Sequence, residues 1–297
     1  MELRLPPVKA FALKPTLAPD VAQQQAVDKR VSIVAGGLSG LFSRPKPEEV
    51  DLSYAESRYE AFWHVVCTVR YVFERNKSFS VPVTAPEVRK VTVLGQEFEV
   101  AAPPAPPQQQ SSPTAFLQQI GQQIGLSSTG PRTFSLPGVE YCVDENRQER
   151  FLEAVAGQAL AAGVDYVRKE SIELTNLADL TGGGALVVTP QLSAARIVRT
   201  LLGTMVKQIQ ADNILEEATT IETLNLYFRP VYAFEFAWRP KNKNAVVEFD
   251  GLTGAMANGK IVRTGGTLSP EALFDITPDS AASLFPSFVS NVQVTAA

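Results

Sequence analysis

The segment Tyr59-Glu-Ala-Phe-Trp-His-Val-Val-Cys-Thr-Val-Arg-Tyr71 places an apolar or aromatic side chain at every odd-numbered position. Polar side chains fall at even-numbered positions, among them Glu60, His64, Thr68 and Arg70. Successive side chains of a β-strand point to opposite faces, so this period of two predicts a long antiparallel strand with one buried face.

The residues around this strand predict a helix before it and hairpins after it. Residues 19–35 are rich in Gln and Ala, and Asp20 near their start favours the positive end of a helix. Polar and glycine-containing turns separate the apolar runs that follow. The elements expected there are a turn at 74–77, a strand at 78–83 and a hairpin around Gly95 that joins 91–93 to 97–100.

The second half of the chain predicts a similar order of elements. Apolar residues at helical spacing indicate a helix over 145–160 that stops at Gly163. Thr189 and Pro190 fit the N-cap and first position of another helix, whose apolar stripe runs to Ile209 and must pack on a sheet. The other expected elements are strands at 185–188, 224–228, 232–238, 245–249 and near 260–263, with turns at 239–244 and 250–254.

A Pro- and Gln-rich stretch divides these two halves. Residues 101–137 contain Pro-Pro-Ala-Pro-Pro and two Gln-Gln-Ile-Gly units, a composition typical of a linker or a long exposed loop. The fold class expected is therefore α+β, with two helix-on-antiparallel-sheet modules at 1–100 and 138–297 joined by the linker at 101–137.

The two modules share a plan that can be interpreted as an internal duplication. Each has a helix, an aromatic strand, a polar turn and a Val-rich strand, and residues 59–81 compare with residues 227–247. The alternative is that any antiparallel hairpin packed under a helix shows this pattern, because alternation and a charged turn are what such a hairpin requires.

One hairpin also resembles a known family. Phe234-Glu-Phe-Ala-Trp238, a polar turn and Val246-Val-Glu-Phe-Asp-Gly-Leu-Thr-Gly254 are similar to the hairpin of PepSY-like modules. The resemblance covers about residues 189–262. It implies a helix packed on a sheet, and many modules of this family are non-catalytic binding or inhibitory elements.

Composition limits the classes of function. The formal net charge of -4 gives no overall attraction to nucleic acid or to an anionic membrane, and 45% hydrophobic residues can build a sizeable core. No signal peptide and no membrane span are expected, so the cytoplasm is the predicted location. Cys67 and Cys142 each lie in an apolar run, which favours two buried thiols over a disulfide.

No catalytic constellation, cofactor motif or metal site is recognisable. His64 is the only histidine, which excludes sites that need two, and it is interpreted as a structural residue of the strand. The glycine-rich stretches 36–40 and 181–184 lack the Lys-Ser/Thr of a P-loop. We expect no catalytic residue, no metal and no cofactor; a small-molecule ligand remains unknown.

Basic residues gather at two expected hairpin turns and are the candidate binding residues. They are Arg70, Arg75 and Lys77 on one turn and Arg239, Lys241 and Lys243 on the other. One interpretation is that they contact a phosphate backbone or an acidic partner. The other is that they are ordinary solvent-exposed residues of a turn.

The predicted function is a non-catalytic binding or assembly component that associates with a protein partner or with itself. One alternative is a nucleic-acid-associated protein that uses the basic hairpin tips. Another is a hydrolase with a carboxylate site assembled from distant positions.

Overall fold

The computed structural model describes residues 1–35, 45–101, 132–181, 184–266, 269–276 and 278–296. It divides into two compact units built from interleaved segments. The main unit comprises residues 1–70, 145–209 and 217–297, and the ribbon unit comprises residues 71–144 and 210–216. Helices and a large mixed sheet are both present, which confirms the α+β class.

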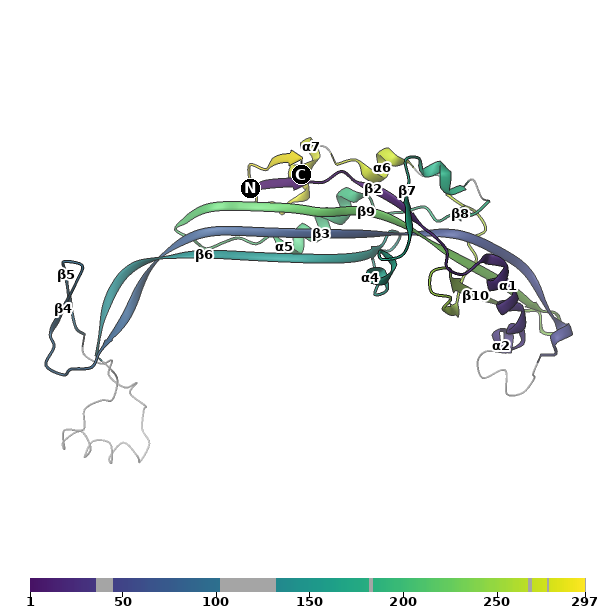
Figure 1. Ribbon diagram of the computed structural model, residues 1–297, viewed down its shortest axis with the longest axis horizontal. Coiled ribbons are helices and arrows are strands. Elements are labelled where there is room, and N and C mark those ends of the chain that lie inside the picture. Colours follow the sequence, from purple (N-terminus) through teal and green to yellow (C-terminus); the bar gives the residue numbers. More distant parts are fainter. Residues whose placement is uncertain (36–44, 102–131, 182–183, 267–268, 277, 297) are drawn as a thin grey trace, which may run out of the picture. The chain divides into compact units, whose positions relative to one another are not determined.

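Three long strands carry the fold: β3 (Val50–Val83), β6 (Arg132–Glu153) and β9 (Asn213–Trp238). β3 pairs with both of the others, and the same three ribbons are visible in Figure 1. The strand predicted at 59–71 is confirmed as part of β3, but the prediction of one buried face is wrong, because Phe62 and Val66 are buried on the other face. The strands predicted at 224–228 and 232–238 are one continuous strand, β9.

Short strands add to β3 and β9 in the main unit. Along its length β9 pairs in parallel with β1 (Glu2–Leu5) and β2 (Lys9–Leu13), and antiparallel with β10 (Lys243–Asp250). The sheet is therefore mixed, and the expectation of antiparallel pairing throughout is not confirmed. The remaining pairs are β1 with β12 (Gln293–Ala296), β2 with β7 (Ser171–Glu173), β3 with β8 (Leu186–Val187) and β10 with β11 (Met256–Asn258).

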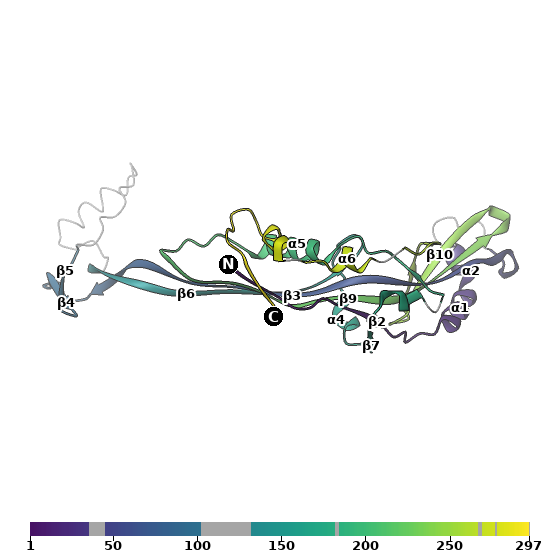
Figure 2. The same ribbon diagram turned by 90° about the horizontal axis from the view of Figure 1, so that it is seen from above.

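Helices cover both faces of the main unit's sheet. Figure 2 shows α5 and α6 on one side of the sheet and α4 on the other. The helices are α1 (Pro19–Asp28), α2 (Arg30–Ala35), α4 (Gly163–Tyr166), α5 (Ala194–Met205), α6 (Pro270–Phe274) and α7 (Pro278–Ala281), with 3-10 turns at Pro47–Glu49, Leu177–Thr181, Arg239–Lys241 and Ala282–Leu284.

The longest helix among the described residues, α5, begins later than its sequence predicts. Its N-cap is Ser193, whose hydroxyl accepts a hydrogen bond from the Arg196 amide. Thr189 and Pro190 stay outside the helix, because the next two amides, those of Gln191 and Leu192, donate to the Ala154 carbonyl. The residues that α5 buries recur at helical spacing: Ala194, Ile197, Val198, Leu201, Leu202 and Met205.

The aromatic hairpin β9–β10 packs on α1 and α2. The sequence pattern had predicted that the helix after Thr189, which is α5, would pack on this hairpin. Small side chains of these helices, Ala22 and Ala26, together with Val34, lie against the hairpin. The hairpin contributes Tyr232, Phe234, Phe236, Trp238, Val247 and Phe249 to this core. The predicted helix at 19–35 is confirmed as two short helices separated at Lys29.

The ribbon unit consists of residues 71–83 of β3, residues 132–144 of β6, residues 213–216 of β9 and a hairpin. The hairpin pairs β4 (Lys90–Val93) with β5 (Gln96–Glu99), as predicted around Gly95. Residues 75–80 of β3 are all exposed, whereas Tyr71, Val72 and Phe73 before them are buried.

Two local predictions are wrong because a sheet ladder overrides the local pattern. Residues 145–153, expected in a helix, belong to β6, where Phe151 packs in a cluster with Phe62 and Leu13, and Gly163 opens α4. Residues 74–77, expected in a turn, continue β3, and Asp212 binds the backbone at Glu74 and Asn76.

The internal duplication is not confirmed, because residues 239–242 do form a turn whereas residues 74–77 do not. The strand expected near 260–263 is also wrong: β11 ends at Asn258, and residues 260–263 are held by side chains instead of a strand partner. The predicted linker lies outside the described residues at 102–131, and residues 132–137 open β6.

Within the described residues, no helix is long and apolar enough to cross a membrane.

Candidate functional site

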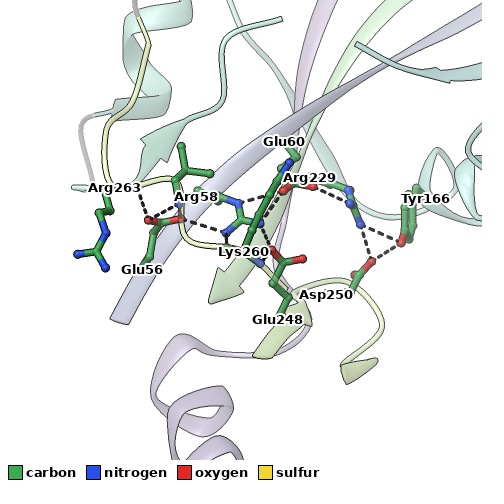
Figure 3. Close-up of polar contacts among 10 residues, drawn as sticks. Glu56, Arg58, Glu60, Tyr166, Arg229, Glu248, Asp250, Lys260 and Arg263 are labelled. Atoms are coloured by element: carbon green, nitrogen blue, oxygen red, sulfur yellow. Dashed lines mark hydrogen bonds and ion pairs between the residues drawn. The ribbon is translucent and has the colours of Figure 1, made fainter. Parts of the chain in front are cut away.

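Alternating charged residues on β3 form the centre of a buried polar cluster in the main unit. Glu56, Arg58 and Glu60 are two residues apart and therefore share one face of the strand. Arg229 of β9 and Glu248 and Asp250 of β10 approach the same face, as Figure 3 shows. We call these six residues, with Tyr166 of α4, the charge network.

Arg58 uses every donor of its guanidinium. Its Nε and Nη2 donate to Glu60 Oε1 at 2.9 and 2.8 Å, and its Nη1 donates to Glu56 Oε1 at 3.0 Å. The remaining donors reach Glu248 Oε1 and, at 3.0 Å, the Lys260 carbonyl. The side chain is 0% exposed, so this saturation is what makes burial of the charge tolerable.

Arg229 extends the network towards α4. Its Nη2 donates to Glu60 Oε2 at 2.7 Å, and its Nη1 donates to Asp250 Oδ2 at 3.1 Å. The Tyr166 hydroxyl donates to the same Asp250 oxygen, and the Arg229 guanidinium lies over the Tyr166 ring, 5.8 Å from its centroid. Glu60 thus joins the two arginines through its two oxygens.

The carboxylates of the network also hold loop backbone. Glu56 accepts hydrogen bonds from the amides of Val262 and Arg263, the latter at 2.8 Å. Glu248 accepts from the Lys260 amide at 2.8 Å. Because the segment 260–263 forms no strand, these carboxylates are what fix it against β3 and β10.

The two arginines keep Glu60 ionised. Burial raises the pKa of Glu60, but the nearby Arg229 and Arg58 charges outweigh that effect, and the net pKa is lowered. Burial lowers the pKa of Arg58, yet Glu248 and Glu60 raise it further, so this guanidinium keeps its proton. Burial, followed by its bond to Asp250, raises the pKa of Tyr166 to about 12.

This arrangement favours a clamp over proton transfer. General acid-base chemistry needs a group with a pKa near the working pH. Here Glu60 is held as an anion, Arg58 as a cation and Tyr166 as a neutral phenol. The network therefore stabilises the junction of β3, β9 and β10.

Sequence reasoning missed this network, although a signal for it was present. Glu-x-Arg-x-Glu at 56–60 places opposite charges on one face of a strand that then turns strongly apolar. Arg229 is the one charged residue in the largely apolar run Leu224 to Phe234, where an unpaired charge would be very unfavourable. Such embedded charges predict ion-pair partners, but not which ones.

Four of the six predicted binding residues lie in the main unit, three of them at or next to the turn Arg239–Lys241. In the main unit, Arg70 pairs with Glu145 at 3.8 Å, and Arg239 pairs with Asp51. Lys243 donates to the Val34 carbonyl at 2.8 Å, and Lys241 is exposed in the turn.

In the ribbon unit, the two predicted basic residues contact neighbours of their own strand and of β6. Arg75 lies over the Phe73 ring, 4.9 Å from its centroid, and Lys77 pairs with Glu140 at 2.6 Å. Whether any of the six binds a ligand stays a prediction.

His64 lies within an aromatic stack. Its ring packs on Phe151 with centroids 4.6 Å apart, and Nε2 contacts Glu149 Oε1 at 2.8 Å. Both cysteines are free thiols: Cys67 is buried, as predicted, whereas Cys142 is only half-buried. Burial, followed by the charge of Glu222, raises the pKa of Cys67 to about 12.

The ribbon unit carries an exposed apolar row on β6. Val139, Tyr141 and Val143 are 58%, 66% and 54% exposed. They alternate along one strand, so their side chains share one face. We call these three residues the β6 row. Among the described residues, β6 forms a strand ladder with β3 alone, which leaves its other edge open over most of its length.

Comparison with known proteins gives no assignment: no protein-family model, curated protein sequence or solved structure matches this chain. Among the described residues, no group of three or more His, Cys, Asp or Glu side chains is arranged to hold a metal ion.

Proposed function

We propose that the chain is a non-catalytic assembly component, and that it associates with protein through the ribbon unit. The observation that carries this proposal is the β6 row, in which three consecutive same-face side chains are more than half exposed. Single exposed apolar residues are common on protein surfaces, but a continuous row beside an open strand edge is typical of an interaction site.

Other apolar side chains of the ribbon unit are also exposed. Phe79 of β3 is 39% exposed, and Ile214 and Leu215 of β9 are 45% and 49% exposed. A narrow ribbon of strands is marginally stable in water unless a further layer covers it. A protein partner would supply that layer.

The main unit supports the proposal in a different way. Its charge network fixes three strands and a loop, as expected of a rigid scaffold.

The alternative of nucleic-acid binding gains less support. Arg70, Lys77 and Arg239 each face a carboxylate of the same chain, which competes with phosphate for their charge. A hydrolase would need a carboxylate with a raised pKa, whereas the pKa of Glu60 is lowered.

Two further expectations belong to this proposal. The cytoplasm is the location predicted from the sequence. The resemblance to PepSY-like modules fits a binding role, and it rests on the β9–β10 hairpin and its Asp250–Gly254 turn.

Native mass spectrometry of the protein purified gently from its own cells tests the assembly role. The wild type is compared with a Val139→Lys/Val143→Lys variant and with a matched control, Val155→Lys/Val164→Lys. The control changes two valines of the main unit that are 43% and 41% exposed. We expect a complex for the wild type and the control, and its loss for the β6 row variant.

Either of two results would refute the proposed function. One is a bare 32.2 kDa chain for the wild type. The other is a complex that survives unchanged in the Val139→Lys/Val143→Lys variant, because the association would then use another surface.

A further inference from the structure

The backbone of β6 shows which residues face its open edge. The Thr133 carbonyl accepts a hydrogen bond from Ala101, and the Phe151 carbonyl accepts one from Leu160, so neither bond goes to β3. The amide of the even-numbered residue Ala154, by contrast, donates to the Ala61 carbonyl of β3. Peptide groups alternate in direction along a strand. The odd-numbered residues of β6 therefore present their backbone groups to the open edge.

The residue Pro137 agrees with this alternation. A proline has no N–H to donate, and within sheets it is confined to edge positions where that donor would face away from the neighbouring strand. Pro137 is odd-numbered and lies within β6. The residues after it, through the β6 row, contain no further proline.

The side chains and the backbone of the β6 row both favour the addition of another strand at the open edge. Val139, Tyr141 and Val143 are odd-numbered, so their backbone donors and acceptors face an edge that no described strand covers, and their apolar side chains are exposed. A strand that added to this edge would gain ladder hydrogen bonds and an apolar contact together.

The sequence of the row is symmetric about Tyr141, which indicates a second copy of the same strand as the occupant. We propose that two copies of this chain pair antiparallel through β6, with the two-fold axis at Tyr141. This places Val139 opposite Val143 of the other copy and Tyr141 opposite Tyr141. The proposal rests on the assembly function above and names the partner.

Charge repulsion between opposed side chains favours this pairing register over the two adjacent registers. Pairing of odd-numbered residues also permits axes at Glu140 and at Cys142. An axis at Glu140 sets Glu140 opposite its own copy, and an axis at Cys142 sets Glu140 opposite Asp144, so each brings like charges together. With the axis at Tyr141, Glu140 faces Cys142 and Asp144 faces Gly138.

Disulfide cross-linking in a Cys142→Ser background tests the register. Directly opposed positions on paired strands lie within reach of a disulfide. Tyr141→Cys should form a covalent dimer under mild oxidation. Val139→Cys should not cross-link to itself, but a mixture of Val139→Cys and size-tagged Val143→Cys should give the mixed dimer.

The oligomeric state is measured in parallel by sedimentation over a wide concentration range. Tyr141→Pro removes a donor that faces the open edge, so we expect loss of the dimer with little change in Tm. The cysteine variants keep the proposal testable if the proline variant does not fold.

Three results would overturn the inference. They are a wild type that stays monomeric at every concentration, self-cross-linking of Val139→Cys as strong as that of Tyr141→Cys, and a cellular complex that contains another protein but one copy of this chain. The last result would leave the proposed function standing, whereas a bare monomer from cells would refute both.

Discussion

The two units use the same long strand, β3, in opposite surroundings. In the main unit, Phe62 and Trp63 on opposite faces of β3 are both buried, because helices and connecting segments cover each face. In the ribbon unit, residues 75–80 of β3 are all exposed, and the adjacent strand β6 carries an uncovered apolar row. The comparison shows that strand length alone does not make a core: a covering layer does.

The charge network and the β6 row are the clearest contrast between the units. In the network, Arg58 has no free donor and no exposed surface. In the row, Tyr141 has two-thirds of its surface exposed. We therefore expect substitutions to act on folding stability in the main unit and on association in the ribbon unit.

The largest effect is expected for Arg58→Met. Removal of one partner from a buried ion-pair cluster leaves carboxylates without compensation and typically costs about 3–5 kcal/mol. Urea unfolding measures the loss. Arg147→Met is the control, because Arg147 pairs with Glu222 but is exposed, and it should lose little stability. Equal losses for both variants would contradict the role given to the network.

A smaller loss is expected from a cavity in the core under α5. Leu202 is 0% exposed, and Leu→Ala changes at such sites cost about 2–5 kcal/mol. Val143→Ala in the ribbon unit should leave the unfolding free energy of the monomer nearly unchanged. Thermal unfolding at low protein concentration measures both, and a large loss for Val143→Ala would show that the row is already covered.

The pH dependence of stability should reveal Glu60. Its folded pKa lies below the ordinary value of 4.5, so the stabilisation is fully present above about pH 4.5 and is lost as the pH falls through the folded pKa. Glu60→Gln removes this contribution. The stability difference between wild type and variant should therefore be largest at neutral pH and shrink in acid. A difference that grows in acid would mean that Glu60 is protonated in the folded state.

The smallest stability effect is expected for Val139→Lys/Val143→Lys. Surface substitutions away from special features usually change stability by no more than about 0.5 kcal/mol. Chemical unfolding of the dilute protein should thus superimpose on the wild type, while sedimentation at high concentration should differ. A strongly destabilised variant would place the row in a core and remove the contrast between the units.

The parts of the fold set by local periodicity could be predicted from the sequence. The alternation at 59–71 and the glycine of the 91–99 hairpin both gave the right element. The helical spacing at 145–160 misled, because the edge of β3 offers residues 145–153 a ladder that local spacing does not reveal.

The site was beyond sequence reasoning for a related reason. The pattern at Glu56, Arg58 and Glu60 predicts a charged strand face. The partners Arg229 and Glu248, however, lie far along the chain. Only the pairing of β3 with β9, and of β9 with β10, brings them together. The openness of the β6 edge likewise depends on which strand takes the other side.

The two thiols differ in burial, so the wild-type protein can be labelled at one cysteine without any substitution. With a pKa of about 12, buried Cys67 is almost entirely protonated at neutral pH, and only a thiolate reacts readily with maleimide. Cys142 is half-buried and stands next to Tyr141 in the sequence. A maleimide dye should therefore label the wild type at one position beside the β6 row, and its fluorescence would follow association in real time.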